Sequence, residues 1–149
     1  MRALALGLVL LSGAAQAQAP YTVENGEIKA SLTGKRGDPV QGRKIVVERS
    51  KGLCLLCHSG PFPEAPFQGD LAPTLAGVGA RMSAGELRLR MVDGAKVNPQ
   101  TIMPAYYRTD GLNRVAPAFA GKPVLSAEEI EDVVAFLLTL KDGEPERMK

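Results

Sequence analysis

The sequence predicts a mostly α-helical fold with long ordered loops and no substantial sheet. Three stretches show apolar residues at helical spacing behind a capping residue, whereas no segment alternates polar and apolar residues as a half-buried strand does. The segments between them are rich in proline, which excludes long regular elements. With 149 residues, the chain fits one domain.

The first predicted helix begins at Asp38 and Pro39. Asp is a good N-terminal cap, and Pro is favoured at the first helical position. We expect this helix to reach about Ser50, before Gly52 breaks it. Gly42 leaves a bare spot on its surface, which favours close packing against another helix.

A capping box, in which a hydroxyl caps the helix and a Glu three residues later reaches back, predicts the second helix. Ser83 and Glu86 form this pattern and place the helix at 84–93, ended by Gly94. Met91 falls on its apolar face, where core packing is the expected role.

The last helix is predicted by a second capping box, Ser126 with Glu129. Its apolar residues recur at the spacing of a buried helical face: Ile130, Val133, Val134, Leu137 and Leu138. Lys141 suits its C-terminal end, and Gly143 stops it. The segments 60–79 and 98–123 are expected to be loops.

Residues 1–19 are predicted to be a signal peptide. A short positive start precedes the apolar run 3–11, and small residues then allow cleavage after Ala17 or Ala19. The run is too short to span a bilayer, so we expect export to the periplasm and no membrane span. The alternative is an uncleaved amphipathic N-terminal helix. An arm or loop at 20–37, the main domain at 38–142 and a flexible tail at 143–149 would follow.

The charge and composition exclude several functions. The net charge of +2 falls to +1 without Arg2 (17 minus 16) and gives no sign of nucleic-acid binding. There is neither a glycine-rich phosphate loop nor an internal repeat. Aromatic residues make up only 5% of the chain and Trp is absent, so a bound flat apolar cofactor would supply core area that the side chains lack.

The segment Cys54-Leu55-Leu56-Cys57-His58 carries the chemistry of this chain. It is C-x-x-C-H, the attachment signature of a c-type haem. Two thiols at this spacing can bond the two vinyl groups of the porphyrin, and the adjoining imidazole can bind the iron. The chain has two Cys and one His, and all three fall in this segment. We therefore predict one covalent haem c on Cys54 and Cys57, with His58 as an iron ligand.

Two alternatives to haem attachment are weaker. A redox-active or structural C-x-x-C disulfide is compatible with an oxidising compartment, but a thioredoxin-like site needs a βαβ pattern that is not visible. A zinc site usually needs four protein ligands, whereas Cys and His together number three here.

The second iron ligand cannot be another His, so a methionine is expected. Met103 is the best candidate, because it lies in a proline-punctuated loop and Pro104 pushes it into an extended conformation. Met82, directly before a helix cap, stays open as an alternative, and Met103 as a core residue is the other reading. Filled axial positions favour electron transfer over oxygen or peroxide chemistry, and a haem enzyme or gas sensor would require an open iron position.

The position of the motif favours a cytochrome c-like fold. It leaves 91 residues after His58 (149 minus 58), which suits a fold whose N- and C-terminal helices cross beside the haem. A four-helix-bundle cytochrome would carry the motif near its C-terminus. Gly42 and Phe136 are the expected contacts at the crossing.

Several segments within about 38–140 resemble the SoxX family, the monohaem subunits of the bacterial sulfur-oxidation complex SoxAX. They are 52–63 (GLCLLCHSGPFP), 98–108 (NPQTIMPAYYR), 114–119 (RVAPAF) with 121–123 (GKP), and 129–134 (EIEDVV). The long loops match as well as the haem motif does, which makes the resemblance specific.

The resemblance implies an electron-transfer subunit that pairs with a SoxA-like cytochrome in an L-cysteine S-thiosulfotransferase. That complex couples thiosulfate oxidatively to the carrier SoxYZ, and its reacting cysteine lies on SoxA, so this chain would contribute no catalytic residue. A small cytochrome c would accept the electrons. By position, the resemblance assigns the haem to Cys54 and Cys57 and the iron to His58 and Met103. The wider similarity to class I cytochromes implies that the Pro73 carbonyl orients His58. The alternative function is a free-standing monohaem electron carrier.

Overall fold

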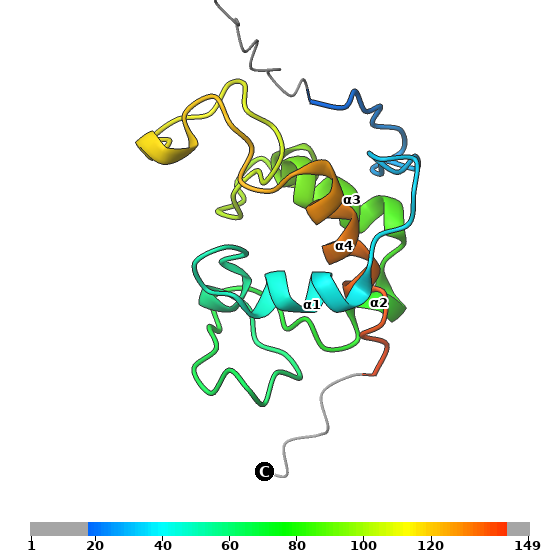
Figure 1. Ribbon diagram of the computed structural model, residues 1–149, viewed down its shortest axis with the longest axis vertical. Coiled ribbons are helices and arrows are strands. Elements are labelled where there is room, and N and C mark those ends of the chain that lie inside the picture. Colours follow the sequence, from blue (N-terminus) through cyan, green and yellow to red (C-terminus); the bar gives the residue numbers. More distant parts are fainter. Residues whose placement is uncertain (1–17, 143–149) are drawn as a thin grey trace, which may run out of the picture.

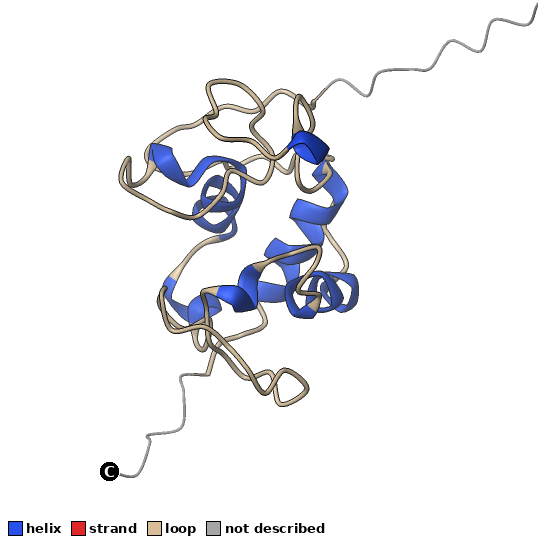
Figure 2. Cartoon of the chain, turned by 90° about the vertical axis from the view of Figure 1, so that its left-hand side faces the viewer, coloured by secondary structure: helices blue, strands red, loops and turns tan. Residues whose placement is uncertain are grey.

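The structure is a computed structural model that describes residues 18–142, and it is built from helices and loops (Figures 1 and 2). The helices are α1 (Pro39–Val47), α2 (Val78–Arg81), α3 (Ala84–Asp93) and α4 (Ala127–Leu137), with 3-10 turns η1 (Cys54–Leu56), η2 (Gly94–Lys96) and η3 (Pro117–Phe119). Between residues 18 and 142 the only β pairing is an isolated antiparallel bridge of Glu24 with Glu27. The predicted mostly α fold is confirmed. No helix in this range is long and apolar enough to cross a membrane.

Two predicted segments fall largely or wholly outside the described residues. The signal peptide prediction covers 1–19, of which only the last two residues are described, and the tail prediction covers 143–149. In the segment 20–37, predicted to be an arm or loop, the chain turns at Asn25 and Gly26, whose φ angles are 51° and 80°. Ile28 and Leu32 anchor this arm in the hydrophobic core.

Helix α1 begins as predicted and ends early. The Asp38 side chain accepts a hydrogen bond from the Val40 amide at 2.8 Å, and Pro39 is the first helical residue. The helix stops at Val47 rather than near Ser50, because Glu48 is extended and its carboxylate accepts hydrogen bonds from the amide and hydroxyl of Ser50. This local turn replaces the last predicted helical turn.

Helix α3 matches its predicted bounds, and both capping boxes form as expected. Met91 is buried in the core, as predicted. Helix α4, however, ends at Leu137, before the expected Lys141. Thr139 and Leu140 donate their amides three residues back, and the Leu140 carbonyl accepts the Gly79 amide at 2.9 Å. The chain therefore leaves the helix and forms a hydrogen bond with Gly79 in α2.

Two short helical turns interrupt segments that we expected to be loops throughout. Helix α2 begins after Gly77, whose φ is 68°, near the end of the 60–79 segment, and continues to Arg81. The turn η3 lies in the 98–123 segment and begins at Pro117. Both are too short to give a hydrophobic period that the sequence would reveal.

Helices α1 and α4 cross with their backbones in direct contact, as the sequence predicted. A Cβ built on Gly42 would lie 1.9 Å from the Asp132 carbonyl oxygen and 2.8 Å from the Phe136 Cβ. Phe136 is buried, and its ring packs on Phe62 at a centroid distance of 6.1 Å. Only glycine permits this approach without a shift of the two helices.

A buried ion pair joins α3, α4 and the arm. Arg88 donates through Nε and Nη2 to the two carboxylate oxygens of Glu131, at 2.7 and 2.9 Å. The remaining groups are also satisfied, because Glu131 accepts the Leu32 amide and Arg88 donates to the Ile28 carbonyl. A buried pair needs this full complement of hydrogen bonds to offset desolvation.

We predict that Gly42→Ala destabilises the protein by about 1–3 kcal/mol, although alanine is the better helix former. The new methyl group would force the two helices apart at the Asp132 carbonyl. Urea unfolding of the haem-loaded protein measures the effect. Val40→Ala, on the exposed face of the same helix, is the control and should change the free energy of unfolding by less than about 0.5 kcal/mol. An unchanged midpoint in Gly42→Ala would contradict the crossing geometry.

Candidate functional site

The cysteine motif begins at a strained backbone position. Leu53 has a φ of 59°, uncommon for a side chain of this size, and turns the chain into η1. The amides of Cys57 and His58 then both donate to the Cys54 carbonyl, at 3.2 and 2.9 Å. The Cys54 thiol is buried and that of Cys57 is half-buried, and they are not joined in a disulfide. This compact turn presents both sulfurs and the imidazole from one short segment.

The loop after the motif orients the histidine ring. His58 Nδ1 lies 2.6 Å from the Pro73 carbonyl oxygen. A carbonyl oxygen only accepts, so Nδ1 carries the proton and donates. This contact leaves Nε2 as the nitrogen that can bind a metal. The Pro73 contact expected from the resemblance is confirmed.

Backbone hydrogen bonds hold this loop against the motif. Ala72 donates its amide to the Cys57 carbonyl at 2.9 Å, and Leu75 donates to the Ser59 carbonyl at 2.8 Å. Gly69 allows the approach, because a Cβ there would lie 2.2 Å from the Leu56 carbonyl oxygen. The orientation of His58 is therefore set by a closely packed loop rather than by a single contact.

Tyr106 ties the methionine loop to the cysteine motif, and sequence reasoning gave it no role. Its hydroxyl donates to the Gly52 carbonyl at 2.6 Å, and the Cys54 thiol donates to the same carbonyl at 3.3 Å.

Burial raises the pKa of Cys54 to about 11, against the lowering effect of the Tyr106 hydroxyl. Burial, and then the charge that Cys54 would carry, raise the pKa of Tyr106 well above its ordinary value. Both groups stay protonated at neutral pH. The run of aromatic residues soon after Met103 was the signal available in the sequence.

The two candidate methionine ligands are alike in burial. Met103 and Met82 are both half-buried and both pack against the core. They differ in their connection to the motif. Met103 lies in the same loop as Tyr106, whose hydroxyl donates a hydrogen bond to the Gly52 carbonyl. The Met103 amide donates to Thr101 Oγ1 at 3.2 Å, which shapes the turn that carries it. This connection favours Met103.

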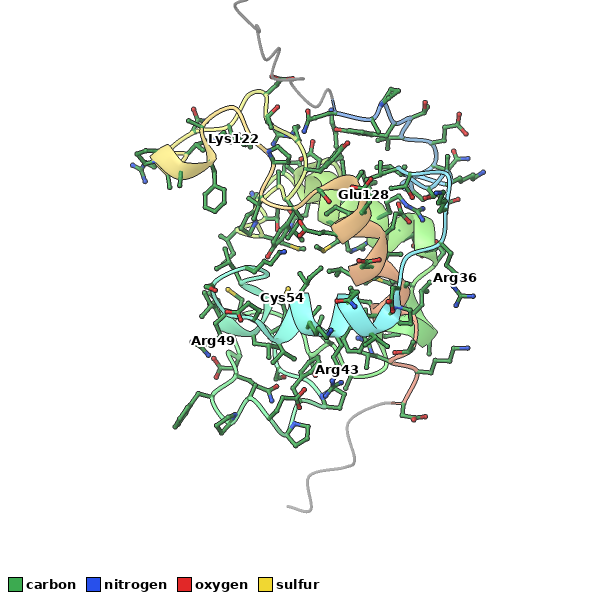
Figure 3. The ribbon with its side chains drawn as sticks, in the orientation of Figure 1. Arg36, Arg43, Arg49, Cys54, Lys122 and Glu128 are labelled. Carbon is green, nitrogen blue, oxygen red and sulfur yellow. The ribbon has the colours of Figure 1, made fainter. Side chains whose placement is uncertain are left out.

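The residues around the motif fit an apolar, metal-containing cofactor. Figure 3 labels Cys54 below the upper loops of the molecule. Leu56 is 44% exposed and Ile102, beside Met103, is 71% exposed, so large apolar side chains stand open on the two segments that carry the expected ligands. Within residues 18–142, no three His, Cys, Asp or Glu side chains gather in a group that could hold a metal ion.

The chain is similar to a solved structure, the crystal structure of SoxXA from P. pantotrophus. The two chains are 38% identical with a TM-score of 0.76, and the match covers 82% of this chain and 95% of the other. No protein-family model matches the chain, and no curated protein matches it.

Proposed function

Because the chain belongs to the SoxXA family of cytochromes, we propose that it is the SoxX subunit, a periplasmic haem c protein that transfers electrons within an L-cysteine S-thiosulfotransferase. One observation carries the proposal: the C-x-x-C-H segment places two free thiols beside a histidine whose Nδ1 is held by Pro73. A chain with a single such motif and no third cysteine fits SoxX rather than SoxA.

Cys54 and Cys57 would hold one haem c, and His58 and Met103 would bind its iron. When bound, the haem supplies one-electron Fe(III)/Fe(II) chemistry. Pro73 keeps His58 in one tautomer and one orientation, leaving Nε2 free to coordinate. Tyr106 holds the loop of Met103 to the cysteine segment. A site held this rigidly changes little between oxidation states, which favours electron transfer.

We predict that the protein made with a working haem-maturation system has the mass of the polypeptide plus one haem under denaturing mass spectrometry. Haem that is bound through thioether bonds stays on the denatured polypeptide, whereas haem that is held only by coordination of its iron is lost. The variant Cys54→Ser with Cys57→Ser is the control and should show the polypeptide mass. The polypeptide mass in the wild type would exclude a c-type haem.

We predict that Met103→Ala removes the near-infrared methionine-to-iron charge-transfer band of the oxidised protein. Met82→Ala should keep the band, since Met82 is equally half-buried and tests for general damage to the core. Optical spectra of the three haem-loaded proteins check this. Loss of the band in Met82→Ala alone would identify Met82 as the ligand. Absence of the band in the wild type would favour a haem enzyme or gas sensor.

We propose that the partner is a SoxA-like cytochrome, that the complex acts on the carrier SoxYZ with thiosulfate, and that a small cytochrome c accepts the electrons. The name SoxXA of the similar structure supports a pair of subunits. Since this chain has two cysteines and both are assigned to haem, the reacting thiol would belong to the partner.

We predict that the chain elutes with a SoxA-like subunit in gel filtration of native periplasm, and that a tagged chain retains that subunit. A free-standing carrier would elute at its monomer size with no such companion. Reconstitution then gives the activity test, since conjugation of thiosulfate to SoxYZ should need both subunits.

We also propose that export ends with cleavage after Ala17 rather than after Ala19. The Ala19 amide donates to the Tyr107 hydroxyl at 2.7 Å, and the Gln18 side chain contacts the Tyr107 carbonyl and the Thr109 hydroxyl. Cleavage after Ala19 would remove these contacts.

We predict that peptide mass mapping of periplasmic protein finds Gln18, free or cyclised, as the first residue. The variant Ala19→Pro, which removes the amide donor, should still be processed after Ala17 while losing the contact to Tyr107. A first residue of Pro20 would contradict the proposed cleavage position.

A further inference from the structure

An apolar segment projects from the molecule between Met103 and α4. Every residue of 113–122 is exposed, and the run Val115-Ala116-Pro117-Ala118-Phe119-Ala120 contains no polar side chain. Figure 1 shows this yellow segment, with η3, extending beyond α3 and α4. Val115 and Phe119 are each 38% exposed. A run of exposed apolar residues in a folded protein indicates a surface that another molecule covers.

Local hydrogen bonds give the projecting segment a defined shape. Pro117 begins η3, and the Phe119 amide donates to the Ala116 carbonyl at 2.8 Å. Lys122 closes the turn by donating its amide to the Phe119 carbonyl at 3.0 Å. Beyond it, the Leu125 amide bonds the Tyr106 carbonyl, and the Leu125 side chain is buried. A preformed element binds with a small loss of conformational entropy, which favours docking over a random apolar loop.

The charges beside the apolar run indicate the kind of partner surface. Arg114 precedes the run and Lys122 follows it, both exposed (Lys122 is labelled in Figure 3). Neither forms an ion pair with any described carboxylate, although Arg108 at the base is paired with Asp93. The complementary surface would therefore be an apolar pocket with an acidic rim.

Two other surface features give weaker evidence of a docking surface. Phe67 and Leu71 are 82% and 69% exposed, but Gln68 and Asp70 interrupt the apolar residues between them. The Phe67 carbonyl also already accepts a hydrogen bond from Arg49. The hollow beside α1 is basic, yet Arg43 within it is paired with Glu64 at 2.6 Å and stacks on the Phe62 ring. The segment 113–122 alone combines a continuous apolar run, a fixed shape and unpaired charge.

We infer that segment 113–122 is the arm by which this chain docks onto the SoxA-like subunit. Phe119 and Val115 would enter an apolar pocket of that subunit, and Arg114 and Lys122 would face acidic residues at the rim of the pocket. This inference rests on the proposed function. The name SoxXA of the similar structure supports that occupant over a second copy of this chain.

The test compares haem-loaded variants for binding to immobilised SoxA-like subunit. Val115→Ser with Phe119→Ser should weaken the affinity roughly 30-fold, as expected for loss of a central aromatic anchor. Phe67→Ser, which removes a more exposed aromatic from a different loop, is the matched control and should stay within about twofold. Arg114→Glu with Lys122→Glu should slow association and reverse its dependence on salt.

The outcomes separate this inference from the proposed function. If the wild type does not bind the subunit, the proposed function fails. If the wild type binds and the Val115/Phe119 variant binds equally well, the subunit role stands and the docking arm is wrong. A change in the haem spectrum of that variant without a change in affinity would mean that the segment covers the cofactor instead. Self-association that the variant abolishes in sedimentation would assign the arm to a second copy.

Discussion

The direct contact of α1 with α4 at Gly42 is the constraint on which the site depends. Because glycine brings the helix backbone against the Asp132 carbonyl, the chain leaves α1 close to the core and enters the cysteine motif a few residues later. Gly52 continues the same close packing, since a Cβ there would lie 2.2 Å from the Ile45 carbonyl oxygen. The motif thus follows directly on a closely packed part of the molecule.

The loops are ordered by hydrogen bonds between distant segments rather than by secondary structure of their own. Pro73 bonds His58 and Tyr106 bonds Gly52, so the loops on the two sides of the motif are each joined to it. The Arg88–Glu131 pair similarly holds the arm through Leu32. In a chain with few aromatic residues, these bonds and the haem that we propose would replace much of the packing that large side chains usually provide.

A rigid site and a rigid docking arm would serve the same purpose in electron transfer. The loop that carries Met103 continues through Tyr106 to the projecting segment and returns at Leu125, which bonds Tyr106 again. One loop would therefore connect the proposed iron ligand to the proposed partner surface. Such a connection would hold the cofactor at a constant position relative to the partner, as a fixed subunit requires and a diffusing carrier does not.

The sequence by itself determined the starts of α1, α3 and α4, the mostly α class and the C-x-x-C-H segment, because caps, hydrophobic period and the Cys-Cys-His spacing act over a few neighbouring residues. Gly42 and Phe136 were also predicted at the crossing, and Pro73 was predicted from the family resemblance. The ends of α1 and α4, the turns α2 and η3, and the role of Tyr106 required the tertiary structure. Each depends on competition between alternatives of similar energy: at Leu140, the Gly79 amide from a distant segment draws the chain out of the helix. Tyr106 acquires its role only when folding brings it to Gly52, 54 positions earlier in the chain.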